Sequence, residues 1–303
     1  MINTAQVIRF AIESGFVRAG VSQPTMASKY VTAFKEWTDA GHSAGMHWMY
    51  KYYDFPAYLQ ARFGWAKSVL VVVDNYLQPG NWPVEFPKVA RYAWGADYHR
   101  VVERKLKRIC RIIRKMEPAT ITRTYVDAGP VMQKAFAAQA GLGWIGKNNL
   151  LIVPEIGSYC FIGIVFLSID LEFNEPMAER CGGCRRCLAA CPNGALTDGY
   201  KLDARRCTAY LTIEKEGEFS AAEKELLHGW LYGCDLCQEA CPYNQTWTRP
   251  GDQQYGESFT SLGRSLNDWL KLTESEFLTL FRNHPVKRLG YDLWRRNLHA
   301  LMK

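Results

Sequence analysis

The sequence predicts an α+β fold in three parts: a mixed α/β domain over residues 1–173, a small cysteine-rich domain over 174–250, and a short helical segment over 251–303. In the first part, apolar runs typical of strands are separated by stretches with helical periodicity. Around Asn174, cysteine, glycine and arginine replace those runs until about Pro250. A length of 303 residues suits two domains and a short extra module.

Apolar patterns predict the strands of the first domain. The run "SVLVVVDNY", at Ser68–Tyr76, is continuously apolar, as expected of a strand that is covered on both faces. Three further strands are predicted at 121–127, 149–154 and 159–169. Together these runs predict one sheet.

Helices are predicted between the strands. Residues 3–15 have a polar start and Gly15 after the end, and 25–40 also look helical. Another helix is predicted at 130–140, with Pro130 in the first turn and Gly141 as the C-cap.

The helix predicted at 99–116 carries eight Arg or Lys residues against one acid, Glu103. An apolar stripe on this helix should pack inward and turn the basic residues outward; the stripe consists of Val102, Leu106, Ile109, Ile113 and Met116. The tail 282–303 adds six basic residues against Asp292. A polyanionic partner such as nucleic acid fits this charge, and a solvated basic surface is the alternative.

No run resembles a signal peptide or approaches the roughly 20 apolar residues of a membrane span. We therefore expect a cytoplasmic protein with no membrane partner. Thiols stay reduced in that compartment, so clustered cysteines indicate metal ligands or redox groups.

The cysteine motif "CGGCRRCLAACP" has the spacing C-x2-C-x2-C-x3-C-P, the bacterial ferredoxin pattern for [4Fe–4S] clusters. In that pattern the fourth cysteine ligates a second cluster. A shorter copy, "CDLCQEACP", lacks its first cysteine, and Cys207 is the nearby spare. The predicted ligands are therefore crossed: one cluster takes Cys181, Cys184, Cys187 and Cys241, and the other takes Cys191, Cys207, Cys234 and Cys237.

A pair of zinc sites is the alternative for these cysteines. Zinc motifs usually pair two cysteines and then leave a long gap, so the spacing favours two iron–sulfur clusters in a ferredoxin-like domain. The two remaining cysteines, Cys110 and Cys160, lie in apolar patterns and are expected to be buried.

The glycines in "AGLGWIGKNN" match G-x-G-x-x-G at Gly141, Gly143 and Gly146. A dinucleotide fingerprint needs a strand before the glycines and a helix after them, whereas here the predicted order is the reverse. These glycines are expected to permit a close backbone approach or a tight turn.

Several long motifs resemble the epoxyqueuosine reductase family: "YVDAGPVMQKAFAAQAGLGWIGKNNLLI", "GSYCFIG", "ARYAWGADYH", "KRLGYDLWRRNLHAL" and both cysteine motifs. The resemblance covers nearly the whole chain. It implies a cobalamin-binding catalytic domain over 1–173, fed by two [4Fe–4S] clusters, and a C-terminal segment that is a truncated HEAT-like stack. It also implies the last step of queuosine synthesis, in which the epoxide of the wobble nucleoside in a tRNA anticodon stem-loop is reduced.

The same resemblance implies the site residues. Asp127 would protonate the departing oxygen and contact cobalamin, and it would need burial to raise its pKa. Capping of the next helix is the alternative role for Asp127. Cobalamin contacts are implied for Arg91, Asn148 and Ser158, each of which can also serve as a structural hydrogen-bonding residue. Lys134 is implied to meet a tRNA phosphate.

Two other functions remain open from the sequence. One is a cobalamin and iron–sulfur reductase of a small molecule, similar to reductive dehalogenases, which are usually exported. The other is an electron carrier, although a carrier would need only the cysteine module. Either reductase requires an external electron donor, expected to be a flavodoxin or ferredoxin.

Overall fold

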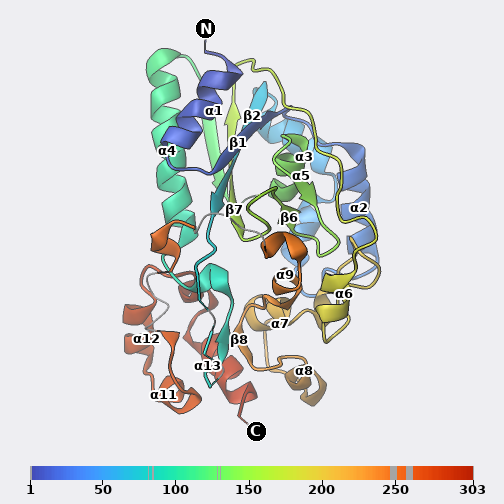
Figure 1. The fold of residues 1–303 in the computed structure, drawn as a ribbon, viewed down its shortest axis with the longest axis vertical. Helices are drawn as coiled ribbons and strands as arrows, with labels where there is room; N and C mark the ends of the chain where they lie inside the picture. Colours follow the sequence, from blue (N-terminus) through green and yellow to red (C-terminus); the bar gives the residue numbers. More distant parts are fainter. Residues whose placement is uncertain are drawn as a thin grey trace.

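The computed structural model describes residues 2–80, 82–83, 85–127, 129, 131–245, 251–256 and 262–302. Its centre is a four-stranded sheet in the order β1-β2-β7-β4, with every neighbouring pair antiparallel (Figure 1). The strands are β1 (Arg18–Ser22), β2 (Ser68–Asn75), β7 (Cys160–Leu167) and β4 (Thr122–Val126). Every residue of β2 is buried, which confirms the prediction of a strand covered on both faces.

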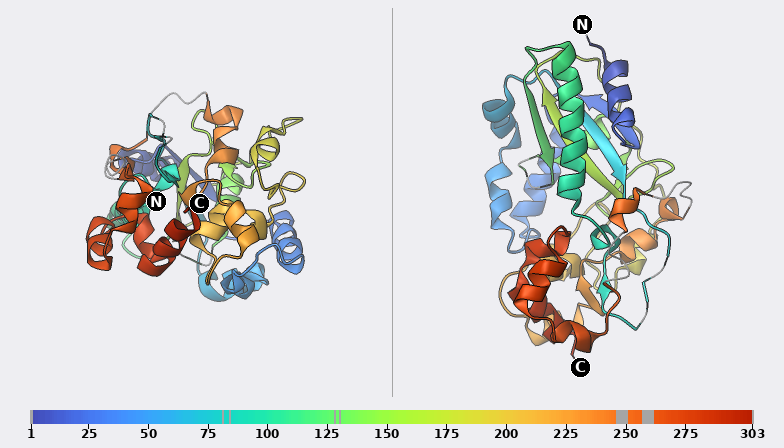
Figure 2. Two further views of the ribbon diagram at one scale, coloured as in Figure 1. Left: turned by 90° about the horizontal axis from the view of Figure 1, so that it is seen from below. Right: turned by 90° about the vertical axis from the view of Figure 1, so that its left-hand side faces the viewer.

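Helices cover both faces of this sheet. On one face, α1 (Thr4–Glu13) and α4 (Tyr98–Met116) share a core with β2 and β7. On the other face, α3 (Phe55–Phe63) and α5 (Gln133–Gln139) pack with the opposite side chains of the same strands. The first part of the chain is therefore a three-layer α/β/α structure, as the views in Figures 1 and 2 show.

The helix bounds follow local capping. Asn3 forms a capping box at the start of α1, and the side chain of Asp97 accepts a hydrogen bond from the backbone of His99 at the start of α4. The predicted stripe on α4 is buried except at its end, where Met116 is 47% exposed. Met116 was wrongly placed in the core: it is the last residue of α4, and its side chain is exposed. Pro130, predicted in the first turn of α5, lies outside the described residues.

The lower part of the molecule combines distant segments. Strand β3 (Lys88–Val89) pairs in parallel with β8 (Trp230–Tyr232), and Trp94 shares a core with the C-terminal helices. These helices are α11 (Leu266–Leu270), α12 (Glu274–Leu280) and α13 (Tyr291–Ala300). A stretch from the first 173 residues thus lies against the C-terminal segment (Figure 2, right).

Strands β5 (Trp144–Ile145) and β6 (Leu151–Ile152) pair in a separate two-stranded sheet, so the prediction that 149–154 joins the main sheet is wrong. The remaining α-helices are α2 (Ser28–Asp39), α6 (Arg186–Ala190), α7 (Thr208–Ile213), α8 (Ala221–Glu225) and α9 (Leu236–Glu239). The 3-10 helices are η1 (His47–Tyr52), η2 (Arg91–Ala93), η3 (Ala204–Arg206), η4 (Pro242–Asn244), η5 (Gln253–Tyr255) and η6 (Pro285–Leu289). Helices α6 and α9 pack against each other below the sheet (Figure 1).

Candidate active site

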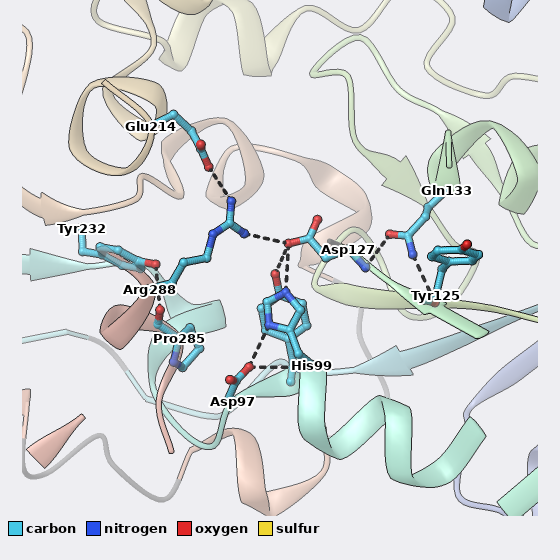
Figure 3. Close-up of polar contacts among 10 residues, drawn as sticks. Asp97, His99, Tyr125, Asp127, Gln133, Glu214, Tyr232, Pro285 and Arg288 are labelled. Carbon is cyan, nitrogen blue, oxygen red and sulfur yellow. Dashed lines mark hydrogen bonds and ion pairs between the residues drawn. The ribbon is translucent and has the colours of Figure 1, made fainter. Parts of the chain in front are cut away.

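Asp127 lies directly after β4 in an unusual backbone conformation. Its φ is 50°, in the left-handed region that non-glycine residues seldom adopt. The Asp127 amide donates to Oε1 of Gln133 at 3.2 Å, and the next described residue, Gly129, has no room for a Cβ because the Tyr125 ring would lie 2.3 Å away. The tight turn directs the Asp127 side chain toward the start of α4 (Figure 3).

Three side chains surround the Asp127 carboxylate. Tyr98 donates a short hydrogen bond from its hydroxyl to Oδ2. Nε2 of His99 lies 3.4 Å from the same oxygen, and Nη1 of Arg288 lies 3.6 Å from it. Tyr98 and His99 come from α4, whereas Arg288 comes from η6 in the C-terminal segment. The site is therefore assembled from segments far apart in the sequence.

Two further carboxylates extend this arrangement. Nδ1 of His99 lies 2.8 Å from Oδ1 of Asp97, and Nη2 of Arg288 donates to Oε1 of Glu214 at 3.3 Å. Anionic and cationic side chains thus alternate from Asp97 through His99, Asp127 and Arg288 to Glu214 (Figure 3).

The electrostatics overturn one sequence expectation. Partial burial acts to raise the pKa of Asp127, but contact with His99, Tyr98 and Arg288 outweighs it, so the pKa lies below its ordinary value. About half of the Asp127 side chain is exposed (49%), so its carboxylate stays accessible to a ligand. For His99, burial acts to lower the pKa, yet Asp127 and Asp97 raise it to about 9. Near neutral pH the proton of this pair therefore resides on His99.

The alternative role of Asp127 as a helix cap is also excluded. The N-cap residue of α5 is Met132, and no side chain caps that helix end. The carboxylate of Asp127 instead faces α4 and η6, so its contacts are those of a polar site.

Lys134 and Asn148 border the site on the α5 side. The ammonium group of Lys134 donates to the backbone oxygen of Asn149 at 2.6 Å. Burial lowers the pKa of Lys134, and the charge of Asp127 offsets part of this effect. Asn148 is buried, and within the described residues the Nδ2 atoms of Asn148 and Asn149 are buried without hydrogen-bond partners. Such orphaned donors suit a polar ligand.

The glycine motif sets the position of this loop. A Cβ on Gly143 would lie 2.1 Å from the carbonyl oxygen of Ile152, so β5 and β6 can approach only at glycine. The order helix, glycines, strand confirms that this is no dinucleotide fingerprint. Lys147, in the same loop, donates to the carbonyl oxygens of Gly182 and Cys184, which connects the loop to the first cysteine segment.

Arg91 and Ser158 lie on another side, near α9. The guanidinium of Arg91 donates to the backbone oxygens of Gln78 and Gly80 and lines a cavity of about 400 Å³ with Tyr159, Glu239 and Asn244. Ser158 is buried, and its hydroxyl bonds with Gln238 and Asn244. Ser158 is thus engaged in joining β7 to the cysteine region, whereas Arg91 is open to a ligand in the cavity.

The cysteines come together in two sets. Burial raises the pKa of Cys187 and of Cys241, and neighbouring thiols raise both further: Cys181 acts on each, Cys241 on Cys187, and Cys184 on Cys241. In the second set, burial is again the main cause, and Cys191 and Cys207 act on both Cys234 and Cys237. Each of these effects lies within one of the two crossed groups, whose assignment to clusters stays a prediction from the motif spacing.

The donor chemistry of both sets fits iron–sulfur clusters. Thiolates are the ligands that such clusters require, and the backbone N–H of Ala195 donates to Sγ of Cys191 at 3.3 Å, as suits a ligating sulfur. Among the described residues, no three His, Cys, Asp or Glu side chains are placed to share a single metal ion. The pKa effects therefore identify which thiols face one another and do not define a mononuclear site.

Comparison with known proteins places the chain in a family. A family model described as epoxyqueuosine reductase QueG, DUF1730, matches residues 57–128, and one described as a 4Fe-4S double cluster binding domain matches residues 180–244. An epoxyqueuosine reductase of Synechococcus sp. (strain RCC307) is 37% identical, over 96% of this chain and 91% of the relative. One of Gloeobacter violaceus is 36% identical, over 98% and 95%. The chain belongs to the epoxyqueuosine reductase family.

Solved epoxyqueuosine reductases have the same fold. The Streptococcus thermophilus structure gives a TM-score of 0.85 at 27% identity, covering 98% of this chain and 80% of that chain. A structure solved with an epoxyqueuosine-modified tRNA-Tyr stem loop gives 0.89 at 24% identity, with the same coverage. As a family member the chain is a reductase with a double-cluster domain. No helix in the described ranges is long and apolar enough to span a bilayer.

Sequence reasoning missed four residues of this epoxyqueuosine reductase site: Tyr98, His99, Arg288 and Glu214. Tyr98 and His99 lie in the quoted "ADYH" motif, so the signal was present without an assigned role. Arg288 lies in the quoted motif "KRLGYDLWRRNLHAL", again without an assigned role, and only the tertiary fold brings Arg288 and Glu214 toward Asp127.

Proposed function

We propose that the enzyme reduces epoxyqueuosine to queuosine at the wobble position of tRNA, using cobalamin and two [4Fe–4S] clusters. Family membership supports the reaction class. The observation that carries the proposal is the connection of the Asp127 site to the second cysteine set through Arg288, Glu214 and helix α7. Helix α7 has Cys207 at its N-cap and Glu214, the partner of Arg288, at its C-cap. Six helical residues span only about 10 Å.

The residues present fit both cofactors. The two thiol sets would hold the clusters, while Arg91, Asn148 and Asp127 would contact cobalamin. Ser158 would line the same pocket and support it through its hydrogen bonds to Gln238 and Asn244. Bound cobalamin supplies reducing electrons to the substrate. An external flavodoxin or ferredoxin would reduce the clusters, as expected for a cytoplasmic enzyme.

In this proposal Asp127 delivers protons to the substrate. Removing the epoxide oxygen as water consumes two electrons and two protons and leaves a carbon–carbon double bond. A carboxyl group at Asp127 would protonate the oxygen as its bond to carbon breaks. Arg288 balances the anionic form of Asp127 between transfers.

The proposed tRNA surface is the basic side of the molecule. Helix α4 and the C-terminal helices lie on the same side (Figure 2, right), and the start of α4 leads to Asp127. Exposed basic residues on α4, including Arg108 and Arg111, would hold an anticodon stem-loop, and Lys134 would meet a phosphate near the site. The target base must leave its stack to reach the site.

A conversion assay with Asp127→Asn tests this proposal. Anaerobically reconstituted wild-type protein should remove one oxygen from the epoxyqueuosine of a modified stem-loop, as measured by mass spectrometry of the nucleosides. The variant should keep about eight irons and its corrinoid but react roughly 10²- to 10⁴-fold more slowly, since it lacks the acid.

Asp170→Asn is the matched control, because Asp170 pairs with Lys67 on the surface and its side chain is 80% exposed. It should react at the wild-type rate. Full turnover by Asp127→Asn would remove Asp127 from the mechanism. An unchanged nucleoside with fully loaded wild-type protein would exclude the proposed reaction.

A further inference from the structure

Asp127 is ionised in this structure, so the proton that it passes to the substrate must come from a neighbouring group. A carboxylate held by Tyr98, His99 and Arg288 has no proton of its own to give. Of these neighbours, Arg288 cannot act as an acid near neutral pH, since a guanidinium does not release its proton. Tyr98 already donates its hydroxyl hydrogen to Oδ2, and burial raises its pKa far above neutrality. His99 is the remaining candidate.

The geometry of His99 suits proton supply. Its Nε2 is buried and makes no hydrogen bond within the described residues, while Oδ2 of Asp127 lies 3.4 Å away. Its Nδ1 is fixed by Asp97 at 2.8 Å, which directs Nε2 toward Asp127. The ring also stacks on Tyr98, with centroids 4.1 Å apart. The imidazole is therefore held so that a small movement of Asp127 completes the hydrogen bond.

We propose that His99 is a positioning residue that supplies Asp127 with the protons passed to the substrate oxygen, and that Asp97 keeps it oriented and charged. The inference rests on the proposed function, because it assigns the origin of protons in that reaction.

The transfer balances atom by atom. The Nε2–H bond of His99 breaks as a proton moves to Oδ2 of Asp127, and Asp127 then passes it to the epoxide oxygen as the carbon–oxygen bond breaks. The electron pair comes from the reductive activity of the enzyme. His99 becomes neutral and takes another proton from water, which allows the second transfer that releases the oxygen as water.

The charges around His99 favour its protonated form. Asp97 on its own helix and Asp127 from β4 raise its pKa to about 9, against the effect of burial. Arg288 from η6 meets the same carboxylate of Asp127 and so opposes this effect. His284, on the segment before η6, is neutral: burial lowers its pKa to about 4, although the charge of Asp97 acts to raise it. His99 therefore carries a proton at neutral pH, where an ordinary histidine is largely neutral.

Single-turnover rates over a range of pH test the inference. The wild-type rate should fall only as pH rises through about 9, where His99 loses its proton. In Asp97→Asn, the fall should move to lower pH by about one unit, because one opposing charge is gone; asparagine still caps α4. His99→Gln should be about 10²-fold slower and lack this fall. His47→Gln, an exposed histidine on η1, should match wild type.

An NMR titration of histidine-labelled holoenzyme gives a second readout. The His99 ring should titrate near pH 9 in wild type and closer to 6.5 in Asp127→Asn. A wild-type His99 that titrates near 6.5, or a His99→Gln enzyme with the wild-type rate and pH profile, would overturn the inference. If wild-type protein converts no substrate, the proposed function fails, whereas the titration still decides the charge state of His99.

Discussion

At the scale of single residues, Asp127 shows what the sequence could and could not predict. Its motif indicated a proton donor, and the expected consequence was a raised pKa through burial. The structure places Tyr98, 29 positions earlier in the chain, on the same carboxylate. Contacts across such separations do not appear in any local pattern, so the direction of the pKa shift could not be predicted.

The raised pKa of His99 makes stability depend on pH. Its folded-state pKa of about 9 exceeds the ordinary value near 6.5, so its protonation stabilises the fold fully below pH 6.5 and ceases to do so as pH rises through 9. The melting temperature of wild type should therefore exceed that of His99→Gln most at pH 6 and least above pH 9. Thermal unfolding of both proteins over this range measures the difference. A difference that does not change with pH would contradict the electrostatic account of His99.

At the scale of elements, the apolar patterns predicted strands β2, β4 and β7 and helices α1, α2, α4 and α5, because a covered face leaves an apolar period in the sequence. Strand β1 and helix α3 were not predicted, and the strand predicted at 149–154 is not part of the main sheet. The motif spacing predicted a double-cluster domain, which the family model over residues 180–244 confirms, while the assignment of each thiol to a cluster stays a prediction. The joining of β3 to β8 was not predictable, because β3 has two residues and is stabilised by tertiary pairing.

Helix α13 anchors α7 through Arg296. This buried guanidinium donates to the backbone oxygens of Leu211, Lys215 and Gly217, at the end of the helix that starts from Cys207. Arg296→Ala would leave these oxygens without their donors and should lower stability by about 3 kcal/mol. It should also reduce the iron content, since the position of Cys207 depends on α7.

Arg295→Ala is the matched comparison, because Arg295 contacts only Tyr291 and His299 in its own helix among the interactions of the described residues. Thermal unfolding and iron analysis of both variants provide the test. Equal melting temperatures and equal iron contents in the two proteins would exclude the anchoring role of Arg296.

At the scale of the whole molecule, Asp127 connects all three parts of the chain. The first part supplies Asp127 and His99, the C-terminal segment supplies Arg288, and the cysteine region supplies Glu214. The basic side of α4 begins at this junction. The sequence showed the basic charge of α4, but only the fold shows that Asp127, the start of α4 and, through Glu214, the helix that follows Cys207 are connected.

The central claim is that electrons from the clusters are consumed at the Asp127 site by an RNA-bound epoxide. The most direct test is to reduce the reconstituted enzyme, remove excess reductant, add the epoxyqueuosine stem-loop, and count electrons lost by the clusters per queuosine formed. Our account predicts a ratio of two, with no cluster oxidation when unmodified stem-loop is added. Cluster oxidation without queuosine, or no oxidation by the modified stem-loop, would contradict it.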